Sequence, residues 1–173
     1  MVIRFEPDGA GIAVALVGSQ GGQVVAGLPV FAICVALAFA VQWVAFVPAF
    51  LRQTERFFDL MGSLSYGALI VTALVLGGVP DLRSLLLGIM VIVWAARLGS
   101  FLFRRISRDG SDRRFDEIKH SGARFLMTWT IQGLWVTFTA AAALAAITTS
   151  NRQDLGWVAL IGFLVWIFGF AFE

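Results

Sequence analysis

The stretch LPVFAICVALAFAVQWVAFVPAF, residues 28–50, decides the fold, because it is uncharged and long enough to cross a membrane. A membrane-spanning α-helix needs about 20 predominantly apolar residues. Lipid cannot satisfy open backbone groups, and the stretch does not alternate like a barrel strand, so we expect a helix. Its glutamine, Gln42, lies near the middle and is expected to hydrogen-bond to a neighbouring helix.

Four more apolar segments follow, at 64–79, 82–103, 125–148 and 155–172. The first of these four is short for a span, so we expect it to be tilted or to extend from its Ser63 end. The chain is 59% hydrophobic and 14% charged, whereas about a quarter of a soluble domain is charged. The sequence therefore predicts an all-α integral membrane bundle of about five transmembrane helices over residues 28–173.

Small residues four positions apart recur in two segments, where they let helix backbones approach closely. The pairs are Ala95 and Gly99, Ala96 and Ser100, Ala141 and Ala145, and Ala142 and Ala146. The single cysteine, Cys34, excludes an intrachain disulfide. One cysteine and one histidine also argue against a structural zinc site, so no metal is expected.

Residues 1–27 contain an apolar stretch of only eight residues, from Ala10 to Val17, with acids at Glu6 and Asp8. A cleaved signal peptide is the less favoured alternative, because it would need a longer apolar stretch and a more basic start. The glycines around Ala10 lack the preceding strand and third glycine of a dinucleotide-binding fingerprint. We expect residues 1–27 to be a flexible external tail.

The stretch 97–124, RLGSFLFRRISRDGSDRRFDEIKHSGAR, contains eight of the chain's thirteen Lys and Arg residues. With five spans, the loops 51–63 and 104–124 share one side and together carry nine basic residues, two in the first and seven in the second. Only Arg4, Arg83 and Arg152 fall on the other side. Because basic loops stay in the cytoplasm, the sequence predicts the N-terminus outside and the C-terminus inside.

Orientation alone could explain this basic loop, but its composition also suits phosphate binding. A Gly-Ser-Asp turn flanked by arginines can direct several guanidinium groups at one point. The candidate phosphate ligands are Arg97, Arg104, Arg105, Arg113 and Arg114, with Asp112 orienting the arginines.

Two polar residues are expected at matched depth inside the helices. Arg97 lies about 10 Å before Arg104, and Gln132 lies a comparable distance beyond Arg124. Arg97 could extend its side chain to the membrane surface, which is the simpler alternative. We expect instead that Arg97 and Gln132 share a polar cavity open to the cytoplasm, in which Gln132 hydrogen-bonds.

The loop 52–67 contributes three further candidates, Glu55, Asp59 and the only tyrosine, Tyr66. Glu55 and Asp59 are four residues apart, so one helical turn would place them on the same face. An ordinary interfacial turn with Tyr66 as an aromatic anchor is the simpler alternative. In the functional alternative, Tyr66 donates a proton or hydrogen bond, and one of the acids orients or polarises it.

Four blocks along the chain resemble bacterial multi-pass membrane proteins of unknown function that are grouped with the steroid 5-alpha reductase superfamily. The blocks are FFDLMGSLSYG at 57–67, VIVWAARLGSFLFRRISRDGSDRRF at 91–115, IQGLWVTF at 131–138 and WIFGFAFE at 166–173. They contain the Trp-x-x-Arg-Leu-Gly, Gly-x-Asp-x-Arg-Phe, Gln-Gly and Gly-x-x-Phe-Glu patterns of those relatives. The resemblance covers roughly 55–173.

The resemblance implies a membrane reductase that takes NADPH from the cytoplasm. Such enzymes deliver hydride to a carbon–carbon double bond conjugated to a carbonyl of a lipid or sterol. It further implies a bacterial inner-membrane location, with membrane lipids and a hydrophobic small molecule as partners and no nucleic acid. Isoprenylcysteine methyltransferases are distant relatives that use S-adenosylmethionine, so the fold alone does not choose the reaction. A non-enzymatic module that binds anionic lipid or a partner subunit is the other alternative.

The relatives continue past their Phe-Glu pair into an Ala-Asp-x-Gln segment and an Arg-His-Pro-Asn-Tyr-x-Gly-Glu signature. This sequence ends at Glu173, before both. We therefore expect it to be the front portion of a longer protein or a shortened relative, and to be catalytically incomplete as it stands.

Overall fold

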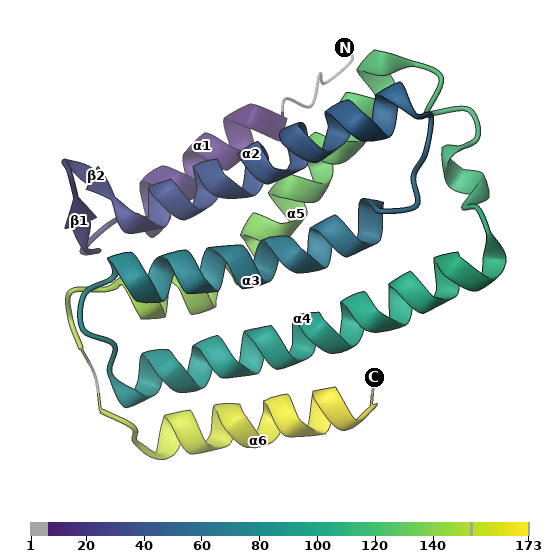
Figure 1. Cartoon of the computed structure of the whole chain (residues 1–173). Helices are drawn as coiled ribbons and strands as arrows, with labels where there is room; N and C mark the ends of the chain where they lie inside the picture. The colour runs from purple at the N-terminus through teal and green to yellow at the C-terminus, as the bar shows by residue number, and fades with distance from the viewer. Residues whose placement is uncertain (1–6, 153, 173) are drawn as a thin grey trace, which may run out of the picture.

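The computed structural model describes residues 7–152 and 154–172 and shows a bundle of helices that lie side by side (Figure 1). The helices are α1 (Pro7–Gly18), α2 (Val30–Leu51), α3 (Phe58–Leu76), α4 (Leu82–Asp109), α5 (Gly122–Thr148) and α6 (Trp157–Phe172). A two-stranded antiparallel hairpin, β1 (Val24–Val25) and β2 (Leu28–Pro29), and the short 3₁₀ helix η1 (Arg113–Phe115) complete the described elements.

Helices α2 to α5 are long and apolar enough to cross a membrane, which confirms the all-α membrane bundle. The fifth predicted span forms α6, whose 16 residues reach only about 24 Å, less than the hydrocarbon thickness of roughly 30 Å. Figure 1 shows the 52–57 and 110–121 loops at one end of the bundle, as expected. The side of the membrane that this basic end faces stays a prediction.

Two helices extend beyond the apolar runs that predict them. Helix α3 begins at Phe58, so the short second span is lengthened through its Ser63 end, as expected. Helix α4 continues to Asp109 and is about 42 Å long, so its arginine-rich last turns extend past the hydrocarbon layer. It ends where Gly110 adopts φ +80°, a left-handed conformation that glycine tolerates without steric cost.

The structure differs from the expected flexible tail, because residues 7–18 form helix α1 alongside the first half of α2. Glycines make this contact possible. A Cβ atom at Gly11 would lie 2.7 Å from the Phe39 ring, and one at Gly18 would lie 2.3 Å from the Phe31 ring. The helix is too short to span a membrane, which is why hydropathy alone did not identify it. Residues 1–6 lie outside the described residues.

The core is built from the facing sides of α2, α3 and α5. Phe31 and Cys34 of α2, Leu69 of α3 and Leu144 of α5 are almost fully buried. Gln42 is also buried and donates from Nε2 to the Ser65 hydroxyl at 2.8 Å, which confirms its predicted role in joining two helices.

The predicted small-residue contact is present between α3 and α4. A Cβ atom at Gly99 would lie 2.7 Å from the Cβ of Ser63, so the two helix backbones approach closely at this level. The contact sets the register of the two antiparallel helices, with Tyr66 packed against Trp94 on one side of it. This register places Arg97 and Tyr66 at a similar depth.

Arg152 joins three helix ends at the opposite end of the bundle. Its guanidinium donates to the carbonyls of Gly77, after α3, and Ile147, in the last turn of α5. It also donates to Ser84 at 2.9 Å and pairs with Asp81, the residue that caps α4. A positive charge beside the carbonyl ends of two helices is favourable.

We predict that Arg152→Met lowers the free energy of unfolding by about 2 kcal/mol, because hydrogen bonds from a charged donor are lost together. Thermal unfolding followed by circular dichroism in detergent measures the change. Arg83→Met is the matched control, because Arg83 forms no hydrogen bond or ion pair with any residue in the described part of the chain. Equal losses in both variants would contradict the role of Arg152.

Candidate functional site

An aromatic cluster holds the 110–121 segment against the basic end of the bundle. Phe115 of η1 is 5% exposed and packs on Phe58 of α3 at 5.0 Å and on Phe125 of α5 at 6.2 Å between ring centroids. Trp129 closes the cluster from α5, edge-to-face with Phe58. The arginine-rich turn is therefore anchored from below by apolar rings that the charge pattern does not reveal.

Glu55 fixes the same segment from the side. It is 6% exposed and accepts hydrogen bonds from the backbone N–H of Asp112 at 3.0 Å and from Lys119 Nζ at 3.2 Å. Burial alone would lower the pKa of Lys119, but its hydrogen bonds to Glu55 and Asp116 outweigh this effect and raise the pKa. Glu55 thus ties the 52–57 loop to the 110–121 segment, which is a positioning role.

The candidate arginines are divided between paired and unpaired groups. Arg105 pairs with Asp59 of α3 at 3.4 Å. Arg114 donates from Nε to both oxygens of Asp112 at 3.0 Å, and the hydrogen bond from Arg114 lowers the pKa of Asp112. Asp112 therefore orients Arg114. Arg104 and Arg113 are exposed and pair with no carboxylate of residues 7–152 or 154–172.

These arginines do not all point at one place, as the sequence suggested they could. Because α4 continues through the arginine-rich stretch, Arg104 and Arg108 lie on one face of the helix, and Arg105 is turned about 100° away from Arg104. Only Arg113 and Arg114 belong to the turn itself. The basic end is therefore a broad charged surface. Arg105 and Arg114 are paired with carboxylates, whereas Arg104 and Arg113 are available to bind an anion.

Tyr66 lines a pocket of about 440 Å³ between α3, α4, α5 and α6. The tyrosine is 4% exposed and packs edge-to-face on Trp94, with ring centroids 5.0 Å apart. Trp166 and Phe170 of α6 form another wall, and Thr139 of α5 stands beside the Tyr66 hydroxyl. The pocket combines flat aromatic walls with hydroxyl groups, a combination that suits an apolar molecule with one polar oxygen.

Arg97 contacts Phe170, a residue in one wall of this pocket. Its guanidinium rests over the Phe170 ring, 4.5 Å from the centroid, and donates a hydrogen bond to the Phe170 carbonyl. Because no residue of α6 is buried, this contact is one of the few that hold α6 beside α4. Arg97 therefore positions a wall of the Tyr66 pocket.

The prediction that Arg97 and Gln132 share a polar cavity is wrong, because the two side chains contact different helices. Gln132 Nε2 donates to the Phe58 carbonyl at 3.0 Å, and a Cβ atom at Gly62 would lie 2.0 Å from that nitrogen. Gln132 is thus packed against α3, while Arg97 faces α6. The prediction used depth along each helix, and depth does not fix the direction in which a side chain points.

Sequence reasoning missed several residues that build the site. Trp94 belongs to the Trp-x-x-Arg-Leu-Gly pattern and Phe170 is a variable position of the Gly-x-x-Phe-Glu pattern, and neither pattern identifies them as walls of one pocket. Thr139 carries no signal beyond its place in an apolar helix, and Trp166 lies in the block at 166–173 but outside the Gly-x-x-Phe-Glu pattern. Lys119 was one basic residue among eight, and its contact with Glu55 joins positions 64 residues apart.

One family model matches residues 45–173, and it describes a protein of unknown function (DUF1295). The match begins in the second half of α2 and includes every site residue discussed above. No curated protein and no solved structure matches the chain.

Proposed function

The chain belongs to this family, and we propose that it is an NADPH-dependent reductase of a carbon–carbon double bond conjugated to a carbonyl in a membrane-soluble compound. The resemblance to the steroid 5-alpha reductase superfamily motivates the reaction class. The observation that carries the proposal is the Tyr66 hydroxyl, which lies in an aromatic pocket within an apolar bundle.

The Tyr66 pocket supports the substrate half of the reaction. Its aromatic walls suit a flat hydrophobic molecule, and a volume of about 440 Å³ is in the usual range for small-molecule sites. When hydride adds to the carbon β to a carbonyl, the electrons of the double bond shift and negative charge develops on the carbonyl oxygen; a proton from solvent then adds to the α carbon and gives the saturated ketone. A hydrogen bond from the Tyr66 hydroxyl to that oxygen would stabilise this charge, most strongly where water is excluded.

The basic end supports the cofactor half. Exposed guanidinium groups without a carboxylate partner are the donors that phosphates need, so Arg104 and Arg113 fit the phosphates of NADPH. Arg105 and Arg114 are already paired with Asp59 and Asp112, so they would add positive charge to the site without being the main phosphate ligands. NADPH supplies the hydride when it is bound; the chain's own residues bind phosphate, orient the carbonyl and exclude water.

We predict that Arg104→Gln and Arg113→Gln each weaken NADPH binding about tenfold, because each removes a charge-assisted hydrogen bond. Fluorescence titration of NADPH against the full-length protein in phosphatidylcholine nanodiscs measures the affinity. Arg83→Gln, on the opposite end of the bundle, should leave it unchanged. Unchanged affinity in both test variants would remove the phosphate role.

Binding assays on the same protein distinguish the reductase from the two alternative functions. Saturable binding of S-adenosylmethionine in place of NADPH would favour a methyltransferase. Loss of binding to phosphatidylglycerol vesicles in Arg104→Gln and Arg113→Gln, with no NADPH binding in the parent protein, would favour a lipid-binding module. The reductase predicts saturable NADPH binding in nanodiscs that contain no anionic lipid.

A further inference from the structure

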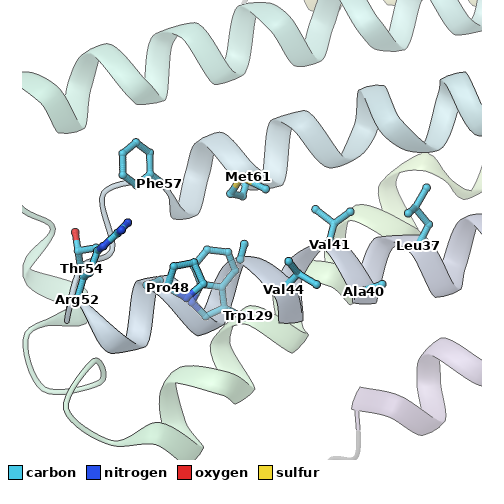
Figure 2. A pocket seen from close by; sticks show the side chains of 12 residues that line it. Leu37, Ala40, Val41, Val44, Pro48, Arg52, Thr54, Phe57, Met61 and Trp129 are labelled. Carbon is cyan, nitrogen blue, oxygen red and sulfur yellow. The ribbon is translucent and has the colours of Figure 1, made fainter.

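A second pocket, of about 600 Å³, opens between α2 and α3 near the basic end (Figure 2). We propose that it binds one anionic glycerophospholipid, whose ester carbonyl accepts a hydrogen bond from Trp129 and whose phosphate lies at Arg52. This site is separate from the Tyr66 pocket, which is lined by other residues, and does not depend on the proposed reductase activity.

The first observation is an unsatisfied donor. Trp129 is 1% exposed and lines the pocket, yet its indole N–H has no acceptor within the described parts of the chain. Contacts with Phe58 and Phe125, at 5.0 and 6.1 Å, fix its ring. By contrast, Trp43 donates its indole N–H to the Thr130 hydroxyl at 3.0 Å. An unpaired buried N–H is costly, and a ligand oxygen beside Trp129 would remove that cost.

The second observation is a cation at the mouth of the same pocket. Arg52 caps the end of α2, is exposed and forms no ion pair with any described carboxylate. Figure 2 shows Arg52 and Thr54 at one end of the pocket, with Pro48 and Trp129 further in. Pro48 lies one helical turn before Arg52, about 6 Å along the axis. The pocket therefore offers a positive charge at the interface and a neutral donor roughly one turn deeper.

The rest of the pocket suits a hydrocarbon chain. Leu37, Val41 and Val44 continue along α2 away from the basic end, and Met61 faces them from α3 (Figure 2). Val44 is 72% exposed, so the groove is open to the lipid phase. A ligand that lies here needs an apolar chain below its polar groups.

The spacing of polar groups selects the lipid class. A fatty acid has a single polar group and could satisfy either Arg52 or Trp129. A glycerophospholipid has a phosphate and, a few bonds deeper, an ester carbonyl, so it can reach both. The free guanidinium at the mouth favours a headgroup with net negative charge. Thr54 and Phe57 line the same pocket, so a bound lipid would also support the loop that carries Glu55.

Native mass spectrometry of the full-length protein with added dioleoyl phosphatidylglycerol tests the site. We expect one lipid to be retained, with about tenfold weaker binding in Trp129→Phe and in Arg52→Gln. Trp135→Phe is the matched control, because Trp135 lies on the same helix and is 71% exposed. Dioleoyl phosphatidylcholine and oleate should each bind several-fold more weakly than phosphatidylglycerol.

A second pair of variants keeps the test valid if Trp129→Phe disturbs the aromatic cluster. Val44→Trp fills the groove from the lipid side and should abolish retention, whereas Val75→Trp should not, because Val75 is equally exposed on α3 outside the groove. Equal retention of all three lipids would overturn the proposal. So would wild-type binding in Val44→Trp, because the lipid would then be bound elsewhere.

Discussion

Replacing Tyr66 with phenylalanine is expected to lower kcat for reduction of a hydrophobic enone about 100-fold, with little change in NADPH affinity. Removal of one preorganised donor from a developing oxyanion costs on the order of 100- to 1000-fold in kcat. The substitution removes only the hydroxyl, so the edge-to-face contact with Trp94 and the burial of the ring are kept. Oxidation of NADPH, followed at 340 nm with cholest-4-en-3-one in nanodiscs, is the assay.

Thr139→Val is the companion variant for this prediction. Thr139 stands beside Tyr66 and donates its own hydroxyl proton to the Trp135 carbonyl at 2.8 Å, so its loss should lower kcat by less than tenfold. Unfolding temperatures of both variants should match the parent protein. If Tyr66→Phe kept full activity, Tyr66 would be a packing residue and the pocket would need another donor.

Glu55→Ala is expected to lower the free energy of unfolding by about 3 kcal/mol and to release the 110–121 segment. Its loss leaves the Lys119 ammonium, which is only 17% exposed, without its most buried partner, and removal of one member of a buried ion pair is strongly destabilising. The Asp112 backbone N–H also loses its acceptor. Chemical unfolding gives the total effect, and trypsin cleavage after Arg113 and Arg114 reports the local opening.

Asp116→Asn is the control for this second prediction. Asp116 also contacts Lys119, at 3.4 Å, but is 56% exposed. Because exposed ion pairs contribute little to stability, the free energy of unfolding should fall by less than about 1 kcal/mol. Equal cleavage rates in the Glu55 and Asp116 variants would mean that Phe115 and its aromatic neighbours hold the segment without help from Glu55.

The spans could be predicted from the sequence because their cause is local. An apolar run such as 28–50 has no stable place outside lipid, and its helix begins and ends within two residues of the expected positions. The end of α4 could not be predicted in this way. Arg104 and Arg105 end the apolar run but not the helix, since arginine has a good helix propensity and the helix ends at Gly110.

Helix α1 was missed because its stability comes from contacts rather than from length. Twelve residues cannot span a bilayer, and the helix is held by the fit of Gly11 and Gly18 against rings of α2 and by the packing of Val14 and Ala15 against the core. The adjoining hairpin is held in part by backbone hydrogen bonds between Gln23 and Thr148 and between Ser150 and Gly21. Pairings between positions so far apart leave no periodic signal in the sequence.

In the site, too, features set by the local sequence could be predicted, whereas contacts between distant residues could not. Spacing along α4 and α5 predicts how deep Arg97 and Gln132 lie but not their partners, Phe170 and Phe58, which depend on helix rotation. The importance of Tyr66 was predicted from residue type and position, and the structure adds its pocket. Glu55 was predicted as an orienting acid, and the group that it orients is the 110–121 segment rather than Tyr66.

The decisive measurement is the transfer of deuterium from NADPH labelled with deuterium at C4 to cholest-4-en-3-one by the full-length protein in nanodiscs. We predict a saturated ketone that carries one deuterium on the carbon β to the carbonyl, formed by the parent protein and about 100-fold more slowly by Tyr66→Phe. A reduced product without deuterium at that carbon, or one formed equally fast by Tyr66→Phe, would contradict hydride transfer to a carbonyl held by Tyr66.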